Sequence, residues 1–216
     1  TIAVANGGGI QKTFRDLGAD FVIDGGQTKN PSSEDFIRAF DTVNADTIFV
    51  LPNNSNIILA ARQAAELYEK SDVRVIDSKT IGDGYAALTM LSYDSADSEK
   101  IVQNFTEAME GVQTGEVSIA VRDAKIGGME IHCGDYIGFC GKSMLSCDRE
   151  RIETARKLAD SLKAGEHEFM IVIYGKSVGT EEREDFHTSI TKSYPKLELY
   201  EIDGGQDIYD YLLILQ

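Results

Sequence analysis

The stretch Thr47-Ile-Phe-Val-Leu51, followed by Pro52-Asn-Asn-Ser-Asn56, shows how the first half of this chain is built. Its apolar and β-branched residues are typical of a buried strand, and the polar turn after them ends that strand. Beyond the turn, apolar residues recur with the 3.6-residue period of a helix, at Ile57, Ile58, Ala61, Ala64, Ala65 and Tyr68. Further strands are predicted at 2–5, 21–23 and 73–76, each followed by a helical pattern. This alternation predicts a parallel, doubly wound α/β sheet with right-handed crossovers.

The pattern changes after residue 112, where short strands follow one another closely. We predict them at 116–122, 129–132, 136–140 and 143–146, with glycine-containing turns between them. This spacing is typical of antiparallel hairpins. The remainder predicts a helix at 152–162, a strand at 169–174, a helix at 182–193, and strands at 197–202 and 211–215. We therefore predict two α/β subdomains, residues 1–95 with the parallel sheet and residues 96–216 with a mixed sheet, divided at the helix near 96–112.

The composition limits the kinds of partner that this chain can have. It carries 36 acidic and 21 basic side chains, for a formal net charge of −15. Phosphate backbones and anionic membranes would repel such a chain, so we expect no nucleic-acid partner. The acidity fits either a solvated surface or a face that meets a basic partner. We also predict no membrane span, because no apolar run approaches the ~18 residues that one requires.

The cysteines indicate the cellular compartment of the protein, and the first residue indicates whether the chain is a fragment. Cys133, Cys140 and Cys147 recur every seven residues, a spacing unlike that of a metal knuckle, and strand packing explains it as well as chemistry does. We therefore predict no metal site and a reduced, cytoplasmic location. Residue 1 is Thr, and a strand pattern begins at Ile2. From this we expect the chain to be cut from a longer polypeptide.

Polar residues follow each strand predicted for the parallel sheet. Because ligands bind beyond the carboxyl ends of such strands, the loops at 6–9, 25–31, 52–56 and 78–80 should meet at one edge. The candidate ligand-binding side chains there are Gln27, Thr28, Asn30, Asn53, Asn54 and Asn56. They favour a hydrogen-bonding cleft for a small polar or anionic group, but Asn and Ser at these positions can equally cap helices.

Two further features lie in the second half. Val22-Ile-Asp-Gly-Gly-Gln27 is echoed by Glu201-Ile-Asp-Gly-Gly-Gln206, so Gln206 joins the candidates. Arg122 and Asp123 lie at the end of a predicted strand and fit either a solvated ion pair or a contact with a partner. The chain has no Gly-x-x-x-x-Gly-Lys-Ser/Thr loop. We predict no catalytic residues within it.

Several of these loops, taken in order, carry a family resemblance. Gly25-Gly-Gln-Thr-Lys-Asn-Pro-Ser32 and Leu51-Pro-Asn-Asn-Ser-Asn-Ile57 are the specific stretches. Supporting pieces are Asn6-Gly-Gly-Gly9, Thr114-Gly-Glu-Val117, Val121-Arg-Asp123 and Gly204-Gly-Gln206. Together they resemble the C-terminal region of the A-type subunit of bacterial fatty acid kinase, a family related to dihydroxyacetone kinase, over essentially the whole chain.

The resemblance implies a DegV-like fold and a non-catalytic module of an ATP-dependent kinase. It implies that ATP and magnesium bind an upstream kinase domain outside this chain, and that this chain itself holds no cofactor. The implied role is to dock a DegV-like, fatty-acid-binding partner protein whose acyl carboxylate is phosphorylated. The alternative is a stand-alone DegV-like protein that binds a small molecule or lipid in the Asn/Thr-rich cleft.

Overall fold

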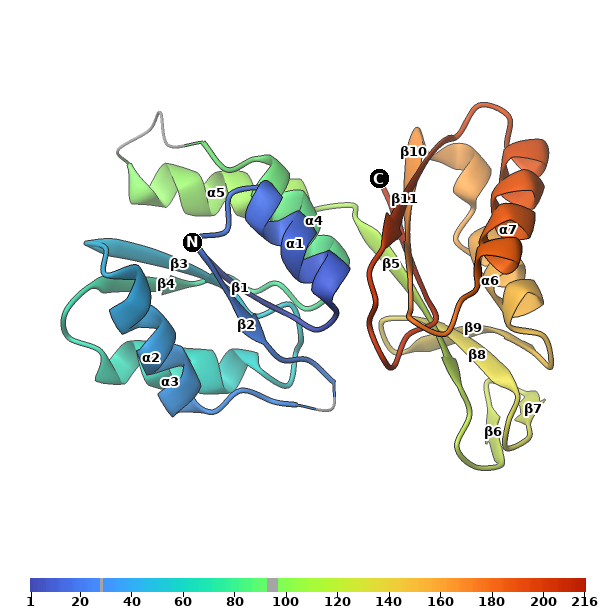
Figure 1. Cartoon of the computed structure of the whole chain (residues 1–216), viewed down its shortest axis with the longest axis horizontal. Helices are drawn as coiled ribbons and strands as arrows, with labels where there is room; N and C mark the ends of the chain where they lie inside the picture. Colours follow the sequence, from blue (N-terminus) through green and yellow to red (C-terminus); the bar gives the residue numbers. More distant parts are fainter. Residues whose placement is uncertain (28, 93–96) are drawn as a thin grey trace. The chain divides into compact units, whose positions relative to one another are not determined.

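The computed structural model describes residues 1–27, 29–92 and 97–216 (Figure 1). The chain forms two compact units, residues 1–112 and 113–216. The sequence places the division at 95/96, whereas in the structure it follows helix α5 (Ser98–Met109). The reason is packing: Ile101 and Phe105 of α5 are buried, and the Phe105 ring lies edge-on to that of Phe49, 5.8 Å between centroids.

Unit 1 is a four-stranded sheet in the order β2-β1-β3-β4, parallel throughout. Its strands are β1 (Ile2–Ala5), β2 (Phe21–Asp24), β3 (Thr47–Leu51) and β4 (Asp72–Val75), and its other helices are α1 (Gly8–Asp16), α2 (Ser33–Val43), α3 (Ile58–Leu67) and α4 (Ile81–Thr89). Helices α2 and α3 cover one face of the sheet, and α1, α4 and α5 lie over the other (Figure 1). The predicted doubly wound parallel sheet is therefore confirmed.

Helix starts in unit 1 follow the expected capping chemistry. Ser32 caps α2, and Thr80 caps α4; each accepts a hydrogen bond from the amide three residues on. Asp35 and Asp83 return the bond, which completes two capping boxes. The first residues of α2 and α4 are thus fixed by side chains within three residues of each helix start.

Unit 2 contains a six-stranded mixed sheet in the order β11-β10-β12-β5-β8-β9. The strands are β5 (Gln113–Ile119), β8 (Tyr136–Cys140), β9 (Ser143–Asp148), β10 (Phe169–Tyr174), β11 (Glu198–Asp203) and β12 (Tyr211–Leu215). Only the β10–β11 pair among them is parallel. Helices α6 (Arg151–Ser161) and α7 (Thr180–Ser193) bury one face around Leu158, Val172, Phe186 and Leu213, and a short 3-10 turn η1 (Ala164–Glu166) follows α6. The predicted mixed α/β sheet with antiparallel hairpins is confirmed.

The start of this sheet differs from the sequence prediction. Strand β5 begins at Gln113 and ends at Ile119, whereas the sequence predicts 116–122. A Cβ at Gly115 would lie 2.7 Å from Leu162 and 2.9 Å from Leu158. The glycine is therefore a strand residue that lets α6 approach the sheet closely.

A separate hairpin leaves the end of β5, formed by β6 (Ala124–Ile126) and β7 (Met129–Ile131) (Figure 1). The sequence predicts its second strand but not its first. Across the described ranges, no helix has both the length and the hydropathy to span a membrane.

Candidate functional site

The candidate cleft of unit 1 lies where its four parallel strands end, and Asn53 is central to it. Asn53 is buried and has a left-handed backbone, with φ of 56°. Its amide N–H donates to Ser78 Oγ at 3.0 Å, and its Nδ2 donates to the Val4 carbonyl at 3.0 Å. Asn53 thus ties the end of β3 to β1 and to the loop after β4.

The Asn53 side chain also fits closely against helix α4. Its Oδ1 is buried and has no hydrogen-bond partner among the described residues. It faces Gly84, where an added Cβ would lie 2.2 Å from it. Because the amide is enclosed by its own neighbours, its role is to hold the edge of the sheet together.

The other candidates of this edge do not form one enclosed site. Asn54 accepts a hydrogen bond from the Asn56 amide at 2.9 Å, which closes the turn before α3. Gln27 and Asn30 are exposed on the loop after β2. Thr28 lies outside the described residues. The structure therefore shows a turn-stabilising role for Asn54 and leaves Gln27 and Asn30 open to solvent.

A polar cluster that sequence reasoning missed surrounds Asp24 at the end of β2. Its carboxylate accepts hydrogen bonds from Lys29 at 2.8 Å, Gln11 at 3.0 Å and Asn6 at 3.4 Å. The bond from Lys29 is the main cause that lowers the pKa of Asp24. The signal was available, because Asn6 and Lys29 lie in the two predicted loops; Gln11 was hidden within a helix pattern.

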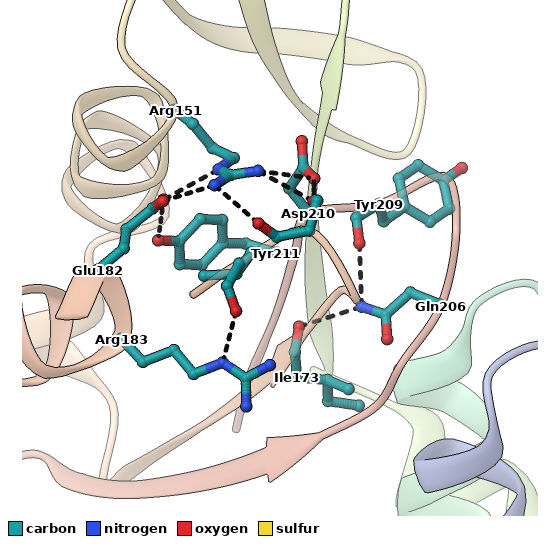
Figure 2. A network of polar contacts seen from close by, with 10 residues as sticks. Arg151, Ile173, Glu182, Arg183, Gln206, Tyr209, Asp210 and Tyr211 are labelled. Atoms are coloured by element: carbon teal, nitrogen blue, oxygen red, sulfur yellow. Dashed lines mark hydrogen bonds and ion pairs between the residues drawn. The ribbon is translucent and has the colours of Figure 1, made fainter. Parts of the chain in front are cut away.

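Unit 2 contains a second polar network, centred on Arg151 at the start of α6 (Figure 2). The guanidinium forms a two-point contact with Glu182 of α7, at 2.9 and 2.5 Å, and contacts Asp210 at 3.2 Å. It also donates to Ser177 Oγ at 2.9 Å, while Tyr211 donates to Glu182 at 2.6 Å. An open pocket of about 310 Å³ lies beside this network.

Hydrogen bonds and burial shift the pKa values of Arg151 and Glu182 in opposite directions. Burial alone would raise the pKa of Glu182, but the bonds from Arg151 and Tyr211 outweigh it and lower that pKa. The bond to Glu182 raises the pKa of Arg151, and burial raises the pKa of Tyr211. Arg151 and Glu182 therefore keep their charges at neutral pH and hold each other, as expected of a structural tie between α6 and α7.

Gln206 lies near this network and is buried (Figure 2). Its Nε2 donates to the carbonyls of Ile173 at 3.2 Å and Tyr209 at 3.0 Å, and its own backbone carbonyl accepts from the Lys176 amide. Gln206 therefore fixes the loop between β11 and β12 onto β10, and its side chain does not reach solvent.

The groove between α7 and β11 is an open pocket of about 510 Å³. His187 Nδ1 lies 2.8 Å from Glu201, which also accepts a hydrogen bond from the Tyr174 hydroxyl. Arg183 contacts Asp203 at 2.9 Å and stacks over the Tyr174 ring. The partner of His187 comes from strand β11, 14 residues further along the chain.

Arg122 and Asp123 lie on the segment between β5 and β6, and both are exposed. Asp123 Oδ1 accepts the Cys133 amide at 2.7 Å. Arg122 has no ion-pair or hydrogen-bond partner among the described residues. Arg122 and Asp123 therefore do not form an ion pair with each other. Asp123 stabilises the hairpin, and the Arg122 side chain is exposed and makes no polar contact among the described residues.

The three cysteines differ in their exposure. Cys133 is exposed, Cys140 and Cys147 are half-buried, and all three are free thiols. Burial raises the pKa of Cys140 and of Cys147, so both are thiols at neutral pH. Within the described ranges, no group of three or more His, Cys, Asp and Glu side chains could hold a metal ion.

We next compared the chain with protein families and with curated proteins. The family model for the FakA-like C-terminal region, from the A-type subunit of fatty acid kinase, matches residues 1–216. Protein YloV of Bacillus subtilis is 36% identical over 212 residues, which are 98% of this chain and 38% of YloV. A protein of Staphylococcus saprophyticus is 35% identical over 216 residues, which are 39% of its length. The chain thus spans about two-fifths of these relatives.

Solved structures show the same fold at low sequence identity. The DegV family protein Cg2579 of Corynebacterium glutamicum matches with a TM-score of 0.65 and 16% identity, covering 99% of this chain and 94% of that one. The Fak B3 protein of Streptococcus pneumoniae, a structure loaded with linoleic acid, matches with a TM-score of 0.58 and 15% identity, covering 85% and 75%. The DegV-like fold is thereby confirmed.

Proposed function

Because this chain belongs to the FakA-like C-terminal family of fatty acid kinase, we propose that it is a non-catalytic module that docks a fatty-acid-binding partner for acyl phosphate formation. The observation that carries the proposal is the family match, which spans all 216 residues. The match covers 38% of YloV, so relatives of that length have room for a separate kinase domain.

The polar groups of the chain support a scaffold role. Asn53, Gln206 and the Arg151 network each bind groups of their own unit. Phosphoryl transfer requires a phosphate cradle and metal-binding carboxylates aimed at one reacting centre. We propose that ATP and magnesium are bound by the remainder of the polypeptide, and that this chain positions the partner.

The test uses the full-length polypeptide that contains this chain and a version that lacks residues 1–216. We expect the full-length protein to bind the acyl-loaded partner in titration calorimetry, and the shortened protein to bind it at least about tenfold more weakly. We also expect the shortened protein to keep its magnesium-ATP site, measured by nucleotide binding. Equal affinity of both proteins for the partner would remove the docking role from this chain.

A second candidate is that the chain itself binds a fatty acid. The observation that favours it is the likeness to DegV-type structures loaded with fatty acids, among them the Fak B3 protein with linoleic acid. Native mass spectrometry of the full-length protein, delipidated and then mixed with oleate, tests it. A bound oleate that is lost on deletion of residues 1–216 would favour this candidate over docking alone.

A further inference from the structure

The hairpin of unit 2 forms a self-contained projection, which we call the arm and define as residues 119–135. Its strands β6 and β7 pair only with each other, and its base, which begins at the last residue of β5, is closed by hydrogen bonds between Ala120 and the Gly134–Asp135 turn. A two-stranded hairpin alone is marginally stable. Here Ala120 and Ile131 are buried with Met144 of β9 in a small apolar cluster, which holds the arm in place.

Three large apolar side chains of the arm are exposed. Val121 is 83% exposed, Ile119 is 50% exposed, and Ile126 is 40% exposed. Ile119 and Val121 lie on either side of the buried Ala120, and both are exposed. Neighbouring apolar side chains that remain exposed can form part of a surface that meets another protein.

The charges of the arm leave one cation available. All three carboxylates have partners within the arm, which the structure describes in full: Asp123 with the Cys133 amide, Glu130 with Lys125, and Asp135 with His132. Arg122, next to Val121, has none. The arm therefore exposes an apolar side chain, Val121, next to an unpaired positive charge, Arg122. This positive site stands out because the whole chain has a net charge of −15.

We propose that the arm is the surface through which this chain docks the fatty-acid-binding partner. Val121 enters a small apolar hollow on the partner, and Arg122 meets a carboxylate at the rim of that hollow. The inference rests on the proposed function and specifies its contact. A second copy fits less well, because pairing two arms about a twofold axis would bring two unpaired Arg122 side chains and two strongly acidic chains together.

The decisive experiment measures the affinity of the full-length protein for the oleate-loaded partner. We expect Val121→Asp and Arg122→Glu each to weaken binding at least about tenfold, because each removes a central contact and places an acid against the partner. We further expect Arg122→Gln to reduce the dependence of the Kd on salt, since it deletes the screened charge pair.

Matched control substitutions lie on unit 1. Leu59 of α3 is 66% exposed, and the Arg15 side chain of α1 is exposed without a partner among the described residues. Leu59→Asp and Arg15→Gln should leave the Kd within about twofold. Thermal melting should show all variants folded, because each altered side chain is exposed.

The outcomes separate the inference from the function on which it rests. If the unsubstituted protein does not bind the partner, the docking function fails. If it binds, and the arm variants bind as tightly as the controls, the docking function stands and the arm is not its surface. A change of oligomeric state in Val121→Asp by sedimentation velocity, with the Kd unchanged, would assign the arm to a second copy and overturn the inference.

Discussion

Replacing Arg151 with alanine tests whether the network in Figure 2 is a structural tie of unit 2. The Arg151 side chain is 16% exposed, Glu182 is 24% exposed, and Asp210 is 13% exposed. Removing one partner of a buried ion pair costs about 3–5 kcal/mol, because the remaining charge stays uncompensated. Since these side chains retain some exposure, we expect the free energy of unfolding to fall by roughly 2–4 kcal/mol at pH 7.

The pH dependence of that loss follows from Glu182. Its pKa is lowered in the folded protein from an ordinary 4.5. A carboxylate with a depressed folded pKa contributes stability that is complete above its unfolded pKa and is lost as the pH falls through the folded value. The gap between the parent and Arg151→Ala should therefore be widest near neutral pH and should narrow below pH 4.5.

Urea denaturation followed by circular dichroism, at pH 7 and at successively lower pH, measures both effects. Arg151→Lys is the matched control, since it keeps the charge but not the two-point contact with Glu182, and it should lose less stability than Arg151→Ala. A loss below about 1 kcal/mol for Arg151→Ala at pH 7, or a gap that widens on acidification, would show that the network contributes little.

Three further predictions concern the edge of unit 1 and metal binding. Gly84→Ala should lower the free energy of unfolding by roughly 1–3 kcal/mol through its clash with Asn53, whereas Gly8→Ala, with open space around it, should not. Asn53→Ala should cost more than Asn54→Ala, about 2–4 against about 1 kcal/mol, because Asn53 makes buried bonds and Asn54 closes an exposed turn. The same denaturation assay measures both pairs, and a reversed order in either would contradict these roles. EDTA should leave the melting temperature unchanged; a drop of many degrees would reveal a structural metal.

The fold could be predicted wherever periodicity and turn residues agree. Strand β3 and helix α3 follow directly from the apolar pattern after Thr47. Ser32 and Ser33 both precede a helix and are both possible caps by sequence; the structure shows that Ser32 is the cap. Strand β5 begins three residues before the predicted 116, because Gln113, Thr114 and Gly115 carry no large apolar side chain that would mark them as part of a strand. Strand β6 has three residues and is mostly exposed, so its sequence carries little periodicity.

The polar sites were less predictable, because they depend on contacts between distant segments. Arg151 and Glu182 are 31 residues apart, and nothing near either one indicates the other. Asn53 and Asn54 have similar local sequence, and only the left-handed backbone at Asn53 directs its side chain inward. The sequence likewise does not show that Asp123 binds the Cys133 amide while its neighbour Arg122 makes no polar contact among the described residues.

The repeated Asp-Gly-Gly-Gln segment shows that identical local sequences can have different environments. Both copies follow edge strands that pair in parallel with a neighbour, β2 with β1 and β11 with β10. The first copy then leads to helix α2 and leaves Gln27 exposed. The second turns back into β12, antiparallel to β10, and this return brings Gln206 under the loop, where it binds Ile173 and Tyr209. The environment of the glutamine is thus set by the direction of the next element, so a shared role for the two copies does not follow from their identical sequence.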